Sequence, residues 1–213
     1  YKHQYIMPEL SDKALINHFY GSAEEEGLHV NVGRIERFTE LDIDYALVFF
    51  EESYNELYGF RSGGNNSYLS VAKFKVEPSG MHLITFLKTC PCGHYEDGHS
   101  SNDIVIYPTF HKIGHKHFLL RKIPKREGRF NKTIFQVYDI DKFEEVLNIE
   151  LESYTINAQG EKEYVQKNSF SFTEDDCAII IQQDSITEEQ TNFELKQEIY
   201  LFEDENNAFV KVD

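Results

Sequence analysis

Apolar and polar residues alternate without a break in the segment Leu147-Asn148-Ile149-Glu150-Leu151-Glu152. Because successive side chains of a β-strand point to opposite faces, this period of two predicts a strand with one buried face and one solvated face. A second segment of this kind spans residues 193–203. There we expect Leu195, Ile199 and Leu201 to face a core.

Strand-like patterns recur along most of the chain. They occupy residues 45–51, 68–76, 82–88, 103–107, 117–123, 133–138, 164–172, 177–183 and 208–212. Residues that favour turns separate them at 61–66, 77–80 and 157–160, a spacing typical of meandering antiparallel sheets. We therefore expect about a dozen strands in all.

One segment near the start of the chain has the signals of a short helix. Ser11 can cap its first turn, and Gly21 suits its end. Between them, Ala14, Leu15 and Phe19 share one face. With a single convincing helix, parallel βαβ winding is not expected. The sequence thus predicts a mainly β fold, α+β at most, of antiparallel twisted sheets or a sandwich with one short N-terminal helix.

The length and composition are those of a globular protein. The chain has 213 residues, 40% of them hydrophobic, which is enough to bury a substantial core. We expect a single β-rich domain over residues 1–213, with two lobes, 1–108 and 109–213, as the alternative. The longest apolar run, residues 45–50, has the length of a strand and predicts no membrane span.

The chain is strongly acidic, with a net charge of −16 from 37 acidic and 21 basic side chains. This charge favours solubility and disfavours nucleic acid or an anionic membrane as a partner of the whole surface. The distribution is uneven, because residues 111–132 include eight Lys or Arg and one acidic residue, Glu127, whereas residues 139–213 are acidic. Such runs are typical of solvated faces, and the alternative is a two-signed surface that a charged partner protein recognises.

Possible metal ligands are crowded into ten residues, Cys90-Pro91-Cys92-Gly93-His94-Tyr95-Glu96-Asp97-Gly98-His99. Cys90, Cys92, His94 and His99 supply the thiolates and imidazoles that a tetrahedral zinc ion prefers. The Cys-x-Cys spacing differs from the Cys-x₂-Cys of zinc knuckles, and no second cysteine pair completes such a site. The same residues could instead form a disulfide element, lie in a solvent-exposed loop or pack in the core.

Two more histidines and a third cysteine widen the alternatives for this loop. His115 and His117, at positions i and i+2 of a strand, would point the same way and could add ligands for zinc. Three cysteines allow one disulfide and leave one thiol over. A bridge from Cys177 to Cys90 or Cys92 is geometrically easier than a bridge between the latter two.

No motif in the sequence identifies a reaction. The chain lacks a Gly-x-Ser-x-Gly elbow, a His-Glu-x-x-His helix and a Gly-rich phosphate loop. Cys92 with His94 or His99 would make a nucleophile and a base, but on a loop without the preorganised support that catalysis needs. A metal-dependent enzyme that uses the Cys/His loop is therefore the less favoured class.

A cluster of large apolar residues gathers at Tyr54, Leu57, Tyr58 and Phe60. Such a cluster is typical of core packing at the end of a strand. The alternative is a contact patch for a partner.

The sequence starts at Tyr1 without a Met, from which we expect a removed secretory or lipoprotein leader, with a lipid anchor upstream of Tyr1 as one form of it. Together with the missing catalytic motif, this predicts a non-enzymatic binding or interaction protein outside the cytoplasm, in the periplasm or at the cell surface. Its expected partner is another protein. The alternative is an acidic immunity or inhibitor protein that neutralises a basic toxin by charge complementarity.

Overall fold

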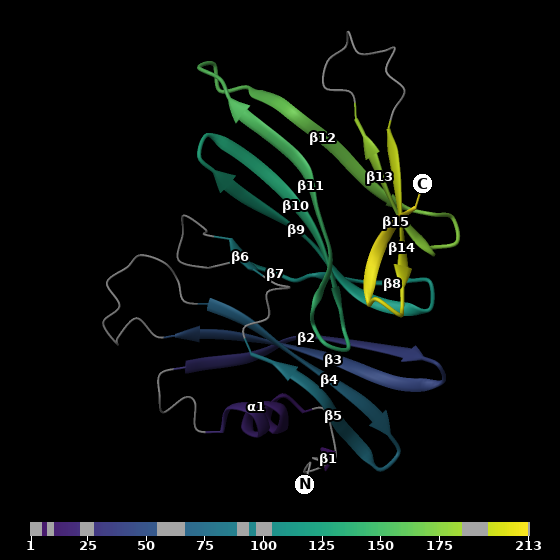
Figure 1. Ribbon diagram of the computed structural model, residues 1–213. Coiled ribbons are helices and arrows are strands. Elements are labelled where there is room, and N and C mark those ends of the chain that lie inside the picture. Colours follow the sequence, from purple (N-terminus) through teal and green to yellow (C-terminus); the bar gives the residue numbers. More distant parts are fainter. Residues whose placement is uncertain are drawn as a thin grey trace. The chain divides into compact units, whose positions relative to one another are not determined.

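The computed structural model describes residues 6–7, 11–21, 28–54, 67–88, 94–96, 104–184 and 196–212. Antiparallel strands make up most of these residues, with one short helix near the N-terminus, which confirms the expected mainly β fold (Figure 1). The chain divides into two compact units. Unit 1 comprises residues 1–108 with 141–143, and unit 2 comprises residues 109–140 with 144–213.

Unit 1 contains a five-stranded antiparallel sheet in the order β1-β5-β4-β3-β2. Its strands are β1 (Ile6–Met7), β2 (Leu28–Glu40), β3 (Ile43–Tyr54), β4 (Ser67–Glu77) and β5 (Gly80–Leu87). A separate two-stranded ladder joins β6 (His94–Glu96) to β7 (Ile104–Ile106). From β2 to β5, each strand pairs with its neighbours in the chain, as expected for a meander.

Helix α1 (Asp12–Tyr20) packs against the core of this sheet. Ser11 caps its first turn through a side-chain hydrogen bond, and Gly21 ends it at a φ of 54°, a conformation that glycine adopts without strain. Leu15 is fully buried, and Phe19 packs beside it. The cap, the end and the apolar face expected from the sequence are therefore confirmed. Among the described residues, no helix has the length and apolar character to cross a membrane.

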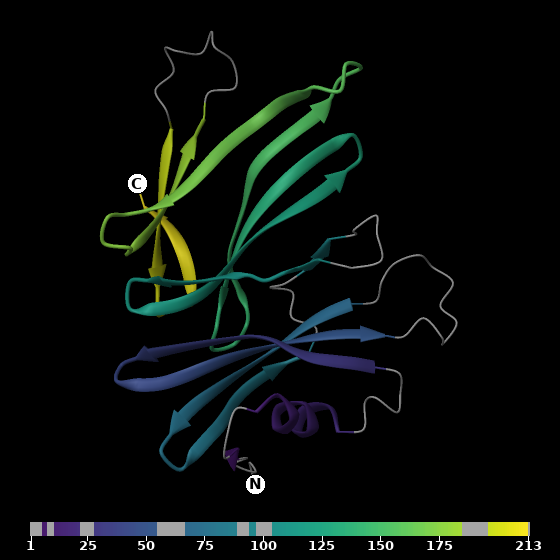
Figure 2. The ribbon, with the colours of Figure 1, turned by 180° about the vertical axis from the view of Figure 1, so that it is seen from behind.

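Unit 2 is an eight-stranded antiparallel meander. Its strands are β8 (Thr109–Ile113), β9 (Lys116–Glu127), β10 (Phe130–Asp139), β11 (Glu145–Ile156), β12 (Lys162–Phe172), β13 (Ala178–Gln183), β14 (Gln197–Glu203) and β15 (Ala208–Val212). Strand β12 changes partner along its length, because it pairs with β11 up to Lys167 and with β13 from Asn168. The eight strands thus form two sub-sheets, β8–β12 and β12–β15, that share strand β12 (Figure 2).

The core of unit 2 contains buried side chains from both sub-sheets. Phe118 and Phe135 lie in the sub-sheet β8–β12, and Ile179 and Phe209 lie in the sub-sheet β12–β15. In β11 the burial follows the predicted alternation in part, since Leu147 and Leu151 are buried and Asn148 is exposed, whereas Ile149 and Glu150 are both half-buried. Packing between the two sub-sheets therefore accounts for the alternation of apolar and polar residues in that segment.

The inward face of β14 differs from the sequence-based expectation. Tyr200 and Phe202 pack against the core, whereas Leu201 is 40% exposed and shares the opposite face with the half-buried Ile199. The prediction that Leu201 faces a core is wrong, and Leu195 lies outside the described residues. Four consecutive apolar residues, 199–202, contain no alternation, and the two aromatic rings fill more core volume than the aliphatic pair.

Candidate functional site

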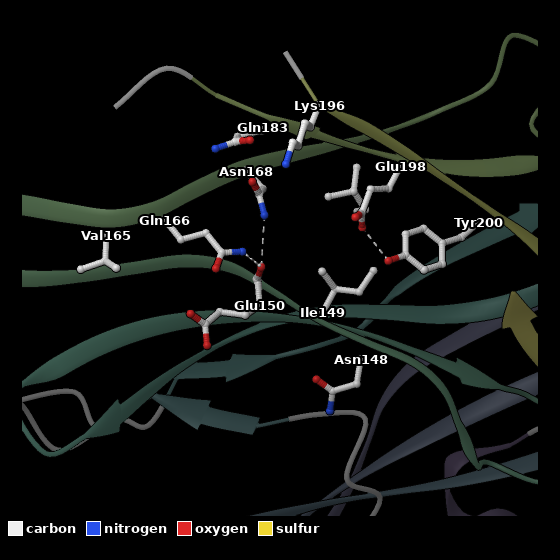
Figure 3. Close-up of a pocket in the computed structure, with 11 residues that line it drawn as sticks. Asn148, Ile149, Glu150, Val165, Gln166, Asn168, Gln183, Lys196, Glu198 and Tyr200 are labelled. Atoms are coloured by element: carbon white, nitrogen blue, oxygen red, sulfur yellow. Dashed lines mark hydrogen bonds between the residues drawn. The ribbon is translucent and has the colours of Figure 1, made fainter. Parts of the chain in front are cut away.

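A hollow of about 560 Å³ opens in unit 2 beside the point where β12 leaves β11. We name it the groove. Four side-chain amides, two carboxylates, a lysine, a tyrosine and three aliphatic side chains line it: Asn148, Ile149, Glu150, Val165, Gln166, Asn168, Ile181, Gln183, Lys196, Glu198 and Tyr200 (Figure 3). Because each amide can both donate and accept, the groove offers hydrogen bonds of both kinds.

One wall of the groove contains the junction between β11 and β12. Gln166 Nε2 donates to the main-chain oxygen of Glu150 at 3.0 Å, and Asn168 Nδ2 donates to the same oxygen at 3.4 Å (Figure 3). The main-chain ladder between the two strands ends at the pair Glu152 and Lys167. Side-chain amides of β12 therefore continue the contact with β11 past the end of the ladder.

A second wall comes from β14, where Glu198 and Tyr200 interact. Tyr200 Oη donates to Glu198 Oε2 at 2.8 Å, and Lys211 Nζ lies 2.6 Å from Glu198 Oε1. Burial, followed by the hydrogen bond to Glu198, raises the pKa of Tyr200 to about 12. Hydrogen bonds from Lys211 and Tyr200 lower the pKa of Glu198. At neutral pH the phenol is therefore uncharged, and the carboxylate is ionised and paired.

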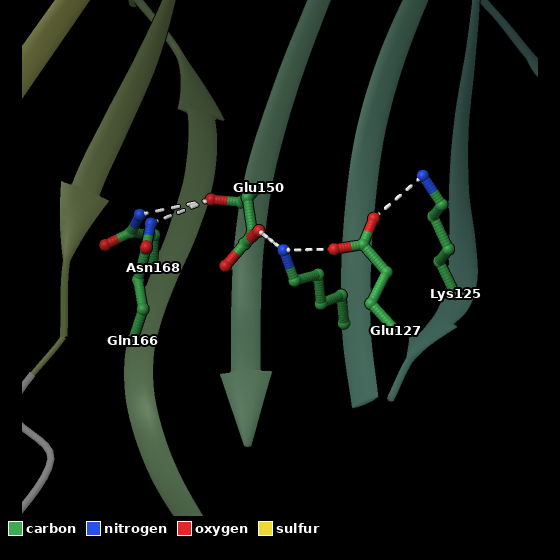
Figure 4. Close-up of polar contacts among 6 residues, drawn as sticks. Lys125, Glu127, Glu150, Gln166 and Asn168 are labelled. Atoms are coloured by element: carbon green, nitrogen blue, oxygen red, sulfur yellow. Dashed lines mark hydrogen bonds and ion pairs between the residues drawn. The ribbon is translucent and has the colours of Figure 1, made fainter. Parts of the chain in front are cut away.

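A chain of ion pairs crosses strands β9, β10 and β11 and ends at the groove (Figure 4). Glu127 Oε1 lies 2.9 Å from Lys125 Nζ, and Glu127 Oε2 lies 2.9 Å from Lys132 Nζ. Lys132 Nζ in turn lies 2.8 Å from Glu150 Oε2. Lys125 and Lys132 are paired across the β9–β10 ladder, where Glu127 offsets their repulsion. Both groove carboxylates, Glu150 and Glu198, therefore have a lysine partner.

We expect the Glu127 carboxyl group to titrate far below its ordinary range. Hydrogen bonds from Lys132 and then from Lys125 lower the pKa of Glu127 from 4.5 to about 2. Because the pKa of Glu127 is lower in the folded than in the unfolded chain, its ionised carboxylate stabilises the fold at pH values above 4.5. This stabilisation is lost as the pH falls from 4.5 towards 2. NMR titration of the side-chain carboxyl carbon measures the pKa directly.

The Lys132→Met variant should raise the pKa of Glu127, because it removes the larger of the two causes. Lys122→Met is the control for loss of one lysine charge, since Lys122 lies on the neighbouring strand β9 and contacts the ring of Phe170 rather than Glu127. An ordinary titration of Glu127 in the unmodified protein would contradict the chain of ion pairs.

The residues predicted to bind zinc lie mostly outside the described part of the chain. Cys90, Cys92 and His99 are among the residues that are not described, and His94 is described by its backbone, at the start of β6. In the described ranges, no group of three or more His, Cys, Asp or Glu side chains is placed to hold a metal ion. Zinc binding by this loop stays a prediction.

The two additional histidines do not share one face of a strand. His115 lies in the turn between β8 and β9, where it is 59% exposed and pairs with Asp204 at 3.1 Å. His117 is buried on β9, and its ring stacks on that of Phe110 at 5.0 Å. The expectation that both lie on one strand is wrong, because His115 belongs to the turn and β9 begins at Lys116.

Two further sequence expectations concern Cys177 and the apolar cluster. Cys177 is exposed with a free thiol, but Cys90 and Cys92 lie outside the described residues, so a bridge from Cys177 to either of them stays a prediction. Partial loss of hydration, and then a hydrogen bond with Asp175, raise the pKa of this thiol, which lowers its reactivity. Tyr54 ends β3, where its backbone is described, whereas Leu57, Tyr58 and Phe60 lie outside the described residues. The contact patch stays a prediction.

The groove was not identified from the sequence. Its polar residues occupy positions that look like the ordinary solvated face of a strand. One signal was present, because residues 166–169 form a run of four polar residues inside the alternating pattern of β12. That run lies where the strand changes partner and could have indicated an irregular position in the sheet.

Comparison of the chain with known protein families, curated proteins and solved structures finds no match. A function therefore has to be argued from the chemistry of the groove.

Proposed function

We propose that the protein is a non-enzymatic binding protein whose groove in unit 2 contacts another protein. The hydrogen-bonding lining of the groove carries this proposal. Its side-chain amides both donate and accept, which matches the N–H and C=O groups of a peptide. Its carboxylates are paired with Lys132 and Lys211. The lowered pKa of Glu198 is also opposite to the raised pKa that a general acid requires.

The acidic inhibitor is the alternative proposal, and it predicts a different kind of contact. A net charge of −16 supports it, because opposite charges accelerate encounter with a basic toxin. Binding of that kind weakens steeply with added salt. Binding through paired carboxylates and amides depends less on salt. We favour the groove because both of its carboxylates already have a lysine partner and so attract a basic protein less. The extracytoplasmic location stays a prediction, which fractionation of cells that express the native gene can check.

The Gln183→Trp variant tests the groove. Gln183 is exposed on β13 and lines the groove, so an indole at this position should fill it without adding charge. The chain contains no tryptophan, so the fluorescence of the introduced indole reports whether it lies in the groove. We expect the variant to bind a captured partner at least about tenfold more weakly than the unmodified protein does.

Partner capture from an extract of the source cells, followed by calorimetry with the purified partner, supplies this measurement. Gln159→Ala is the matched control, because Gln159 is exposed in the turn between β11 and β12 and does not line the groove. A partner that binds the Gln183→Trp variant as tightly as the control variant would show that the groove is not the binding site. Steep loss of binding with salt would favour the inhibitor.

A further inference from the structure

We propose that an extended segment of the partner adds as a β-strand to the open edge of β11 inside the groove. This inference rests on the proposed binding function and names the mode of contact. Strand β11 pairs with β10 over residues 145–154 but pairs with β12 over residues 152–156. Within the described strands, residues 145–151 of β11 therefore have a paired neighbour on one side.

The main chain of β11 faces the groove along that stretch. Asn148, Ile149 and Glu150 are consecutive, and all three line the groove. Because consecutive strand residues point to opposite faces, a hollow that touches all three lies against the edge of the strand. The carbonyl of Glu150 accepts hydrogen bonds from β12, on the side away from β10. By the alternation of an antiparallel strand, the N–H groups of Glu150 and Asn148 point to that side as well.

Side-chain amides protect this edge in the free protein. Gln166 and Asn168 both donate to the single carbonyl of Glu150, at 3.0 and 3.4 Å. An open strand edge invites pairing with another chain, and coverage by polar side chains is one way in which proteins protect it. A peptide N–H can take the place of these two donors. The released amides can then bond to the main chain of the incoming strand.

The chemistry of the groove suits an extended peptide, because amides and aliphatic side chains make up most of its lining beside one lysine, Lys196. The three groove residues of β11 present about 10 Å of strand edge to a partner strand. Ile149 and Ile181 offer aliphatic contacts, and the two groove carboxylates are paired with lysines. In strand addition, the main chain supplies affinity and alternate side chains supply specificity. A carbohydrate would use the side-chain amides without requiring the N–H groups of β11.

Random dodecapeptides displayed on phage are the probe, selected on the intact immobilised protein. The enriched peptides are then synthesised and titrated. Asn148→Pro removes an N–H that points into the groove while the ladder to β10 keeps its bonds, and Asn148→Ala is the matched control that retains the N–H. We expect Asn148→Pro to weaken peptide binding at least about tenfold more than Asn148→Ala does, because the alanine variant removes only a side-chain amide whereas the proline variant also removes the main-chain N–H. Thermal unfolding of both variants checks that the fold is retained.

A second measurement needs no variant of the protein. Each residue of the synthetic peptide is N-methylated in turn, which removes one main-chain donor at a time. We expect binding to fall at alternate positions, because every second N–H of an added strand faces β11. The amides of Asn148 and Glu150 should also become protected from hydrogen exchange when the peptide binds.

The outcomes separate the mode of contact from the binding function. Loss in Asn148→Pro together with the alternating N-methyl pattern establishes strand addition. Peptides that bind in the groove with no such pattern would overturn strand addition and leave the proposed function in place. Strand addition is likewise overturned, and the function retained, if no peptide is enriched while a captured protein still depends on Gln183. Glycans that bind in a Gln183-dependent way, with no peptide or protein bound, would overturn both.

Discussion

We expect the Phe118→Ala variant to lose about 3–5 kcal/mol of folding free energy in unit 2. Phe118, on β9, is fully buried, and the centre of its ring lies 4.9 Å from that of Phe202 and 5.3 Å from that of Phe209. Truncation removes the contacts with both rings and leaves a cavity that packed strands cannot close. Urea unfolding, followed by hydrogen exchange at the amides of the β9–β10 ladder, measures the loss in this unit.

Leu201→Ala is the matched control, because Leu201 neighbours Phe202 on β14 but is 40% exposed. Its truncation should change the free energy of unfolding by about 0.5 kcal/mol or less. By the same reasoning, Ile199→Asp should be tolerated better than Phe202→Asp. Equal costs for Leu201→Ala and Phe118→Ala would show that the inward face of β14 has been assigned incorrectly.

The fold class was predictable because local patterns and long-range packing agree in most strands. In β11 the buried residues Leu147 and Leu151 are those that the alternation marks. Ser11 and Gly21 bound the helix through local hydrogen bonding and backbone freedom, neither of which depends on the rest of the fold. In β14 the pattern lost this information, since both faces are apolar and the packing of whole rings decides which one is buried.

Strand β2 (Leu28–Glu40) shows how a bulge hides a strand. Leu28 and Val30 are buried and alternate with exposed neighbours, but the register with β3 shifts between Val32 and Arg34. A bulge inserts one residue and reverses the alternation beyond it. Gly33 occupies that position, where any side chain would collide with neighbouring side chains. The period of two therefore does not persist through residues 28–40, and the sequence alone predicted no strand there.

The groove was less predictable than the fold, because it depends on a choice of strand partner. Residues 148–150, 165–168 and 181–183 are ordinary strand positions when read locally. They meet because β12 changes its pairing partner from β11 to β13 near Lys167. The packing that decides where this change occurs involves strands that are distant in the sequence. The polar run at 166–169 marks the position but does not specify what the strand does there.

We expect Ser70→Ala to cost about 2 kcal/mol in unit 1. Ser70 is fully buried on β4, and its hydroxyl donates to Glu52 Oε1, which also accepts a hydrogen bond from Tyr20 Oη at 2.6 Å. Glu52 is 1% exposed, and its other oxygen has no hydrogen-bond partner in the part of the chain that the structure describes. Two hydroxyl groups therefore satisfy one oxygen of this carboxyl group, and loss of a donor to a buried acceptor is costly.

A double-mutant cycle with Tyr20→Phe separates the two hydrogen bonds, with urea unfolding as the measurement. Because Ser70 and Tyr20 share one acceptor atom, the second loss should cost more than the first, so the two effects should not add. Glu52→Gln keeps an oxygen that accepts from both hydroxyls but buries an amide nitrogen without an acceptor, so this variant should be destabilised as well. If Ser70→Ala proved as stable as the unmodified protein, the Glu52 carboxyl group would not depend on this hydroxyl. Additive losses would mean that each hydroxyl stabilises the fold through separate contacts and that Glu52 does not couple them.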